Sequence, residues 1–258
     1  MSVAALELRD LVKSFGGLRA VNNVSFAVPD GSLTAVIGPN GAGKTTVFNL
    51  VTNLYVIDSG DVRFYGASLL GKSPGWIAAA GLIRTFQTAR IYPGMTTLEN
   101  ALAGAHLHLR SPVWQQMFWL GPARREERGL TAKADALLDL VGLAPFRNMA
   151  ATDLPMGGQK LLEVVRALMA APRLLLLDEP AAGLNDAETA GLAELLRAVR
   201  DSGITVMVVE HNMSLVMGVA DQVIVLDAGS VVAQGTPREI QQDARVIAAY
   251  VGQEEETS

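Results

Sequence analysis

Residues 38–46, Gly-Pro-Asn-Gly-Ala-Gly-Lys-Thr-Thr, constrain this chain more than any other stretch. They fit the pattern G-x-x-x-x-G-K-S/T, with Gly38, Gly43, Lys44 and Thr45 at the fixed positions. Apolar residues 33–37 precede them and predict a buried parallel strand, and we expect a helix to begin at Lys44. Glycines let the backbone turn its N–H groups toward phosphate oxygens, and the helix adds its positive N-terminal dipole. The segment therefore predicts nucleoside triphosphate binding, with Lys44 on the β- and γ-phosphates and Thr45 on Mg²⁺.

Composition excludes several classes of protein. The chain has 258 residues, 50% of them apolar, which suits a globular α/β protein with a large core. Its net charge of −5 argues against a nucleic-acid partner, because nucleic-acid-binding proteins usually carry a basic excess. Charged residues near the amino terminus argue against a secretory signal, and the apolar run 174–177 is too short to span a bilayer. The absence of cysteine suits a reducing cytosol.

The first half of the chain changes its hydrophobic period. Residues 6–9, 24–28 and 62–65 alternate apolar and polar side chains between turn residues, which predicts an antiparallel sheet. From about residue 90 to 170 the apolar residues recur at helical spacing instead, most clearly over 131–141 and 160–169. We therefore expect a helical subdomain inserted after the β-rich segment.

The second half alternates strands with helices. Apolar runs at 174–177, 205–209 and 223–226 predict strands, and helices are expected over 188–201 and 213–219. Such alternation implies a parallel sheet with right-handed crossovers. The predicted fold class is α/β, with a parallel-sheet core, an N-terminal antiparallel β-subdomain and an inserted helical subdomain.

Two carboxylates follow the predicted strand at 174–177. Asp178 and Glu179 would be costly at the end of a buried strand unless they face a cation or a reaction. In phosphate-loop proteins the first carboxylate helps to hold Mg²⁺, which assigns Asp178 to the metal. Neighbours on a strand project to opposite sides, so Glu179 is expected to point elsewhere and polarise a water for attack on the γ-phosphate.

Three further residues gain meaning from these neighbours. Gln87 lies between the β-rich segment and the helical subdomain, where its amide could reach the metal or the water. His211 follows the strand predicted at 205–209, so its imidazole could bond the γ-phosphate. Phe15 could stack on an adenine. Alone, each also fits an ordinary surface glutamine, loop histidine or core aromatic, and His106 and His108 keep that ordinary interpretation.

The order of these motifs resembles that of the ATP-binding subunits of ABC transporters over nearly the whole chain. The resemblance implies a P-loop NTPase fold with a RecA-like core, ATP and Mg²⁺ as cofactors, and ATPase activity. It implies a single ATPase domain over 1–250, in which 1–88 and 170–250 form the core and 89–169 the helical signature subdomain; an acidic tail, expected to be flexible, covers 251–258. The implied nucleotide-binding residues are Phe15, Gly38, Pro39, Asn40, Gly41, Ala42, Gly43, Lys44, Thr45 and Thr46. The implied metal and catalytic residues are Thr45, Gln87, Asp178, Glu179 and His211.

In this family a signature segment, usually Leu-Ser-Gly-Gly-Gln, closes over the ATP of the opposite subunit. The corresponding segment here is Leu154, Pro155, Met156, Gly157, Gly158 and Gln159. Counting back from Arg166 aligns Pro155 with the serine, whereas matching the glycines and glutamine directly aligns Met156 with it. Either alignment removes the hydroxyl, which leaves backbone N–H groups at a helix N-terminus to bind phosphate. Asn185 stands where the family usually has a D-loop aspartate.

Within the family, the chain is most similar to the LivG-type subunits of branched-chain amino-acid importers. The similarity lies in residues 84–87, 181–185 and 208–213. It implies a complex with a second, non-identical ATP-binding subunit, membrane permease subunits and an external substrate-binding protein. The permease is expected to contact the helical subdomain and Arg90, Ile91 and Tyr92, which places the chain peripherally on the cytoplasmic face of the inner membrane.

Three alternatives remain. A soluble ABC ATPase of repair or translation usually carries tandem modules, long coiled coils or basic segments. A P-loop kinase would explain residues 38–46 but would leave Glu179, His211 and the signature segment without roles. A third alternative keeps the family and changes the cargo, as in a lipid or lipopolysaccharide exporter.

Overall fold

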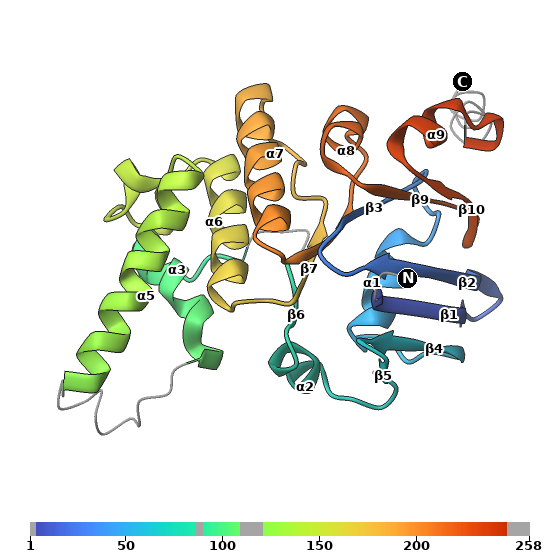
Figure 1. Ribbon diagram of the computed structural model, residues 1–258, viewed down its shortest axis with the longest axis horizontal. Coiled ribbons are helices and arrows are strands. Elements are labelled where there is room, and N and C mark those ends of the chain that lie inside the picture. Colours follow the sequence, from blue (N-terminus) through green and yellow to red (C-terminus); the bar gives the residue numbers. More distant parts are fainter. Residues whose placement is uncertain (1–3, 86–89, 109–120, 247–258) are drawn as a thin grey trace.

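The computed structural model describes residues 4–85, 90–108 and 121–246. Its central element is a six-stranded sheet in the order β10-β9-β3-β8-β7-β6, seen nearly edge-on in Figure 1. All neighbours in it are parallel except β10, which pairs antiparallel with β9. The strands are β3 (Leu33–Ile37), β6 (Leu82–Arg84), β7 (Leu174–Asp178), β8 (Thr205–Val209), β9 (Gln222–Asp227) and β10 (Ser230–Gly235). This confirms the predicted parallel core; β6 and β10, at its two edges, were not predicted.

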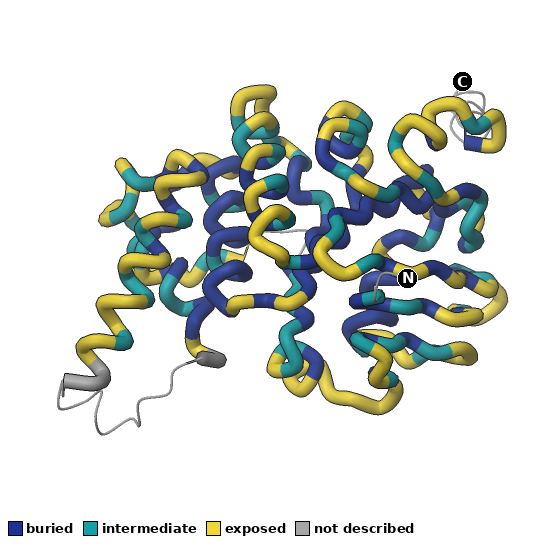
Figure 2. The backbone as a smooth tube through the Cα atoms, in the orientation of Figure 1, coloured by how far each residue is buried: buried dark blue, intermediate teal, exposed yellow. Residues whose placement is uncertain are grey.

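The side-chain alternation of these strands divides the interior into two cores. Leu175, Leu177, Val206 and Val208 lie in one cluster with the helices α5 (Gly121–Leu140), α6 (Met156–Met169), α7 (Asp186–Asp201) and α8 (Met213–Val219). Residues of opposite parity, such as Leu174 and Leu176, lie in a second cluster with α1 (Lys44–Val51) and the antiparallel sheet. The centre of the sheet is therefore buried on both faces, as Figure 2 shows, which explains why its strands read as continuous apolar runs.

The antiparallel sheet has the order β2-β1-β4-β5. Its strands are β1 (Ala4–Phe15), β2 (Leu18–Pro29), β4 (Ser59–Phe64) and β5 (Ala67–Ser68). β1 and β2 extend well beyond the predicted 6–9 and 24–28, because register shifts let the pairing continue past breaks in the apolar alternation. The expectation that Tyr65 continues β4 is wrong, since Tyr65 adopts a left-handed backbone (φ 46°) that ends the strand.

The helical part lies at the left of Figure 1, where α3, α5 and α6 form what we call the helical lobe. The segment predicted at 131–141 belongs to the longer α5, and the segment predicted at 160–169 to α6, which begins earlier, at Met156. The helices are α1 (Lys44–Val51), α2 (Pro74–Ala79), α3 (Thr97–Ala103), α5 (Gly121–Leu140), α6 (Met156–Met169), α7 (Asp186–Asp201), α8 (Met213–Val219) and α9 (Pro237–Gln242). Short 3₁₀ turns η1 (Gly104–His108), η2 (Ala144–Phe146) and η3 (Ala151–Asp153) complete the lobe. Across residues 4–85, 90–108 and 121–246, none of the helices combines the length and apolarity that crossing a bilayer requires.

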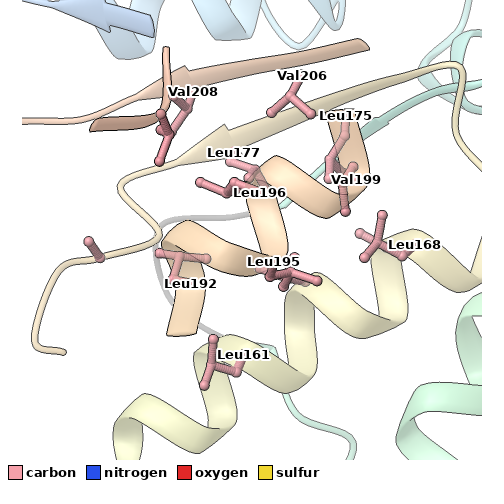
Figure 3. Packing of buried hydrophobic residues seen from close by; sticks show 14 of the residues in the cluster. Leu161, Leu168, Leu175, Leu177, Leu192, Leu195, Leu196, Val199, Val206 and Val208 are labelled. Carbon is pink, nitrogen blue, oxygen red and sulfur yellow. The ribbon is translucent and has the colours of Figure 1, made fainter. Parts of the chain in front are cut away.

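Helix α7 joins the lobe to the sheet. Figure 3 shows Leu192, Leu195, Leu196 and Val199 on α7 between the leucines of α6 and the inner face of β7 and β8. These side chains recur at i, i+3, i+4 and i+7, so one stripe of the helix is buried while its other faces are more exposed. The orientation of α6 relative to the sheet therefore depends on the packing of α7.

Replacing Leu195 by alanine tests this packing. Leu195 is fully buried, so the cavity left by Leu195→Ala is expected to lower the free energy of unfolding by about 2–5 kcal/mol. Denaturant unfolding followed by circular dichroism measures the change. Leu70→Ala serves as the matched control, because that side chain is 47% exposed and its loss is expected to cost less than about 1 kcal/mol. Equal losses in the two variants would contradict the packing described for α7.

Candidate functional site

Residues 38–46 form a tight loop between β3 and α1, as the sequence predicts. Gly38 (φ 148°) and Gly43 (φ 96°) have positive φ values. A Cβ atom at Gly38 would lie 2.0 Å from the carbonyl oxygen of Leu226, and one at Gly43 would lie 2.5 Å from that of Ala20. Glycine is required at both positions because the loop backbone packs directly against neighbouring backbone. Helix α1 then begins at Lys44, as expected.

Lys44 lies inside this loop. Its ammonium donates to the carbonyl oxygens of Gly38 (2.6 Å) and Pro39 (2.8 Å), and the residue is only 8% exposed. Burial lowers the pKa of Lys44 below its usual value, whereas the nearby carboxylates of Glu179 and Asp178 favour the charged form. The loop therefore holds a partly desolvated cation beside two acidic side chains.

A cleft of about 470 Å³ opens over the loop, and we call it the loop cleft. Three sides of it come from the end of β1 with the start of β2, from residues 40–46, and from the turn between β9 and β10. Glu179 reaches it from the segment after β7. The described lining residues are Phe15, Leu18, Arg19, Ala20, Asn40, Gly41, Ala42, Gly43, Lys44, Thr45, Thr46, Glu179, Ala228 and Gly229. The cleft thus brings together residues from widely separated parts of the sequence, most of which the motifs predict.

Phe15 lines the loop cleft at the end of β1. Its side chain is 43% exposed, so the alternative of a core aromatic does not apply. Its ring meets Tyr55 edge to face, with centroids 5.2 Å apart, and the ammonium of Lys13 lies 5.3 Å from its centroid. An exposed aromatic face at the rim of a cleft can stack on a planar ligand.

Asp178 is buried at the carboxyl end of β7 and forms an ion pair that sequence reasoning missed. Arg84, at the end of β6, donates to Asp178 Oδ2 (2.8 Å) and to Asn49 Oδ1 on α1 (2.7 Å). Both charged side chains are at most 8% exposed. Asp178 Oδ1 is also buried, and no residue within the described ranges donates a hydrogen bond to it. A buried carboxylate oxygen without a donor fits a cation ligand.

Glu179 lies near Lys44, but not for the reason that strand alternation gives. β7 ends at Asp178, and Glu179 has a left-handed backbone with φ 49°. Its N–H donates to the carbonyl of Val209 (2.9 Å), and its side chain lines the loop cleft. The sequence analysis treated Glu179 as a strand residue whose side chain points away from that of Asp178. That reasoning is wrong, because Glu179 lies in a turn after the strand, and the turn sets the direction of its carboxylate.

His211 follows the end of β8, the strand that pairs with β7. Parallel pairing puts Val209 level with Asp178 and with Val36 of β3, so the three strand ends form one edge. The side chain of His211 is exposed. Before it, the fully buried Glu210 accepts bonds from the N–H groups of Ala181 (2.7 Å), His211 (3.1 Å) and Asn212 (3.2 Å). Glu210, to which sequence reasoning gave no role, thus links the segment after β7 to that after β8.

Some residues considered in the sequence analysis do not line the loop cleft, and others lie outside the described residues. Gln87 falls within 86–89, outside the described residues, and so does the tail 251–258. His106 lies on the helical lobe, with Nδ1 3.0 Å from the carbonyl of Ala103, and the side chain of His108 is not described.

The signature segment starts α6 at the end of the helical lobe. Helix α6 begins at Met156, before the two glycines and earlier than the predicted 160–169. Pro155 is the N-cap and provides no side-chain hydrogen bond, while Met156 is 69% exposed. The amide of Gln159 donates back to the carbonyl of Leu154 (2.9 Å). The start of α6 therefore presents backbone and an exposed thioether, without a hydroxyl.

A close contact joins this segment to the first turn of α7. A Cβ atom at Gly157 would lie 2.4 Å from Glu188 Oε1, so a larger residue there would displace the end of the Glu188 side chain. Glu188 and Asn185 form a capping box at the start of α7, in which Asn185 Oδ1 accepts from the N–H of Glu188 (2.9 Å). Asparagine at 185 is thus explained locally as a helix cap.

Comparison with known proteins gives the family. The family model described as "ABC transporter" matches residues 21–182, well over half of the chain. The chain belongs to the ABC transporter ATP-binding family. It is an ATP-binding cassette with ATPase activity, and of the motifs that carried the resemblance, Phe15, residues 40–46 and Glu179 line the loop cleft. A second model, "Branched-chain amino acid ATP-binding cassette transporter", matches residues 230–256.

Relatives within the family cover nearly the whole chain. BraF of Pseudomonas aeruginosa, a "high-affinity branched-chain amino acid transport ATP-binding protein", is 42% identical over 98% of this chain and 100% of its own. LivG of Escherichia coli, with the same description, is 39% identical over the same shares. Among solved structures, an ABC transporter cassette in its ADP conformation superposes with a TM-score of 0.83 at 31% identity, covering 97% of this chain and 100% of that one. A nucleotide-free cassette gives 0.81 at 31% identity, over 96% and 98%.

The close packing of Gly43 makes a testable prediction for nucleotide binding. In Gly43→Ala, either the loop moves away from Ala20 or residue 43 leaves its left-handed backbone conformation. In both cases the N–H groups of the loop no longer point together toward the phosphates. We expect ATP affinity to fall about tenfold or more, equivalent to about 1.4 kcal/mol, measured by titration with a fluorescent ATP analogue.

Gly129→Ala is the matched control. This glycine of α5 has nothing within 4 Å of its hypothetical Cβ, so ATP affinity is expected to stay at the wild-type value. Undiminished ATP binding by Gly43→Ala would contradict the steric interpretation of the loop.

Proposed function

We propose that this ATPase powers an importer of branched-chain amino acids. The observation that carries the chemistry is that Lys44 and Glu179 line one cleft, with the buried carboxylate of Asp178 close enough to favour the charged form of Lys44. The cargo is proposed from the near full-length similarity to BraF and LivG and from the match over residues 230–256. No feature of the cleft itself selects the cargo.

Nucleotide binding uses the loop cleft. Phe15 stacks on the adenine, and the N–H groups of residues 38–46 bind the phosphates together with the dipole of α1. Lys44 moves from the carbonyls of Gly38 and Pro39 to the β- and γ-phosphates. Its present acceptors are neutral carbonyl oxygens, and exchanging them for phosphate gives the ammonium an oppositely charged acceptor.

Mg²⁺ would be held by Thr45, Asp178 and Gln87. Oδ1 of Asp178 has no hydrogen-bond donor among the described residues, which supports this assignment, and Thr45 is exposed in the first turn of α1. When bound, the ion would neutralise charge that develops on the phosphates. Arg84 donates to the other carboxylate oxygen, Oδ2, and so fixes the orientation of Asp178.

Glu179 acts as the general base that orients and deprotonates the attacking water. Its place in the loop cleft, close to Lys44, supports this role. His211 steadies the γ-phosphate from the neighbouring strand end. Glu210 holds both segments through buried hydrogen bonds, so the base and the histidine are positioned together.

The signature segment acts on the ATP of another subunit. Met156 is exposed at the start of α6, with the N–H groups of that helix start behind it. The missing hydroxyl supports a second, non-identical ATP-binding subunit as partner.

The permease subunits dock on a groove at the helical lobe. This groove, of about 430 Å³, is lined by Arg90, Tyr92, His106, Glu163 and Arg166 among others. Arg166 donates to the carbonyl of Arg90, and its guanidinium lies 5.0 Å from the centroid of the Tyr92 ring. Docking there would hold the chain, as a peripheral subunit, on the cytoplasmic face of the inner membrane. The external substrate-binding protein would interact with the permease and not directly with this chain.

The base assignment predicts a separation of binding from hydrolysis. Glu179→Gln keeps the size of the side chain but removes its basicity, so ATP should bind with near wild-type affinity while turnover falls by about 10²-fold or more. Phosphate release and analogue titration measure the two quantities. Glu194→Gln, on an exposed carboxylate of α7 that does not line the loop cleft, is the control and should leave both quantities at their wild-type values. Hydrolysis at the wild-type rate by Glu179→Gln would exclude the base assignment.

The cargo and partners are tested by purification from detergent-solubilised membranes. We expect the tagged chain to recover permease subunits, a second ATP-binding subunit and an external amino-acid-binding protein, identified by mass spectrometry. Tyr92→Ala should reduce permease recovery severalfold, because Tyr92 is exposed in the groove, whereas Leu70→Ala should not. Recovery of lipid-export subunits would support the alternative of a lipid or lipopolysaccharide exporter. Recovery of no membrane subunit would support the alternative of a soluble ABC ATPase.

A further inference from the structure

Lys160 crosses from the helical lobe to the segment that carries the proposed base. It lies on α6, one turn after the signature glycines, and its side chain is half-buried. Its ammonium donates to the backbone carbonyl oxygen of Glu179 (3.2 Å). The resemblance to the family gives this lysine no role, although it follows the signature segment directly.

The bond falls on a backbone that is otherwise unfavourable. Glu179 has φ 49°, a left-handed conformation that residues with a Cβ rarely adopt. It is held from both sides, since its N–H donates to Val209 (2.9 Å) and its carbonyl accepts from Ala182 (3.2 Å) and from Lys160. Such conformations persist where surrounding contacts determine them. Lys160 is the contact that comes from the helical lobe.

The surroundings of Lys160 are acidic. Burial lowers the pKa of this ammonium, and the carboxylates of Glu210, Glu179 and Glu163 oppose that effect by favouring its charged form. A narrow cavity beside it is lined by Thr85, Lys160, Glu163, Asp178, Glu179 and Pro180. One lysine thus balances acidic groups of α6, of the segment after β7 and of the segment after β8.

We propose that Lys160 is a positioning residue for hydrolysis, which holds the turn at Glu179 so that the carboxylate of Glu179 points into the loop cleft. The inference rests on the proposed role of Glu179 as the base. Because Lys160 and the signature glycines share one rigid helix, the orientation of the lobe also sets the position of the ammonium. Binding at the start of α6 is thereby linked, within one chain, to the base of that chain's own ATP site.

The test replaces Lys160 by methionine, which keeps much of the apolar stem and removes the ammonium. In the full chain assembled with its co-purified subunits, we expect kcat for ATP to fall tenfold or more. The KM and the affinity for an ATP analogue should change by less than twofold, because Lys160 does not line the loop cleft. Lys160→Arg, which retains a cationic donor, should recover most of the rate.

Lys133→Met is the matched control. Like Lys160, Lys133 donates its ammonium to a backbone carbonyl oxygen, in this case that of Leu168 on α6 (3.1 Å). Burial lowers the pKa of Lys133, as it does that of Lys160. Its bond stays within the helical lobe, so kcat should remain near the wild-type value. Thermal unfolding of each variant checks folding, and Lys160→Gln provides the second variant if Lys160→Met does not fold.

The outcomes separate two hypotheses. An unchanged kcat in the folded Lys160 variants, or an equal loss in Lys133→Met, would overturn the positioning role. A fall in ATP affinity equal to the fall in kcat, or no recovery with Lys160→Arg, would also overturn it. Full turnover by Glu179→Gln would instead overturn the proposed base, on which this inference rests.

Discussion

Parallel pairing of β3, β8 and β7 is the constraint on which the rest of the structure depends. It sets Val36, Val209 and Asp178 side by side, so the segments that follow these strands meet at one edge. The loop at residues 38–46, the pair Asp178 and Glu179, and His211 all leave from this edge. Ligand sites at the carboxyl edge of an open parallel sheet are a general consequence of this geometry.

The alternation of side chains along the same strands distributes the polar residues. Asp178 shares its parity with Leu174 and Leu176, so its carboxylate lies on the face that packs against α1, where Arg84 meets it. Removing one member of such a buried pair is strongly destabilising, although the pair itself adds little stability over an apolar replacement. Its contribution here is orientation, because Arg84 ties α1, β6 and β7 together through Asn49 and Asp178.

Among the described residues, the helical lobe meets the sheet core through apolar packing and through polar contacts. Helix α7 gives it a broad apolar interface, shown in Figure 3, which fixes the position of α6 along much of its length. The start of α6 adds close contacts, between Gly157 and Glu188 and between Lys160 and Glu179. The apolar interface buries side chains of α6 and α7 against β7 and β8, whereas the polar contact of Lys160 joins α6 to the turn that follows β7.

Local sequence determined the parts of this protein whose signal is contained in neighbouring residues. The loop at 38–46, the strands at 33–37 and 205–209, the helix at 213–219 and membership of the family all follow from spacing and period. Tertiary structure alone decided the edge strands β6 and β10, the left-handed turn at Glu179, and the pairs of Arg84 with Asp178 and of Lys160 with Glu179. Arg84 and Asp178 are 94 residues apart, and no local propensity specifies which distant carboxylate a buried arginine will meet. Strand pairing and helix packing set that choice, because they alone bring the two segments together.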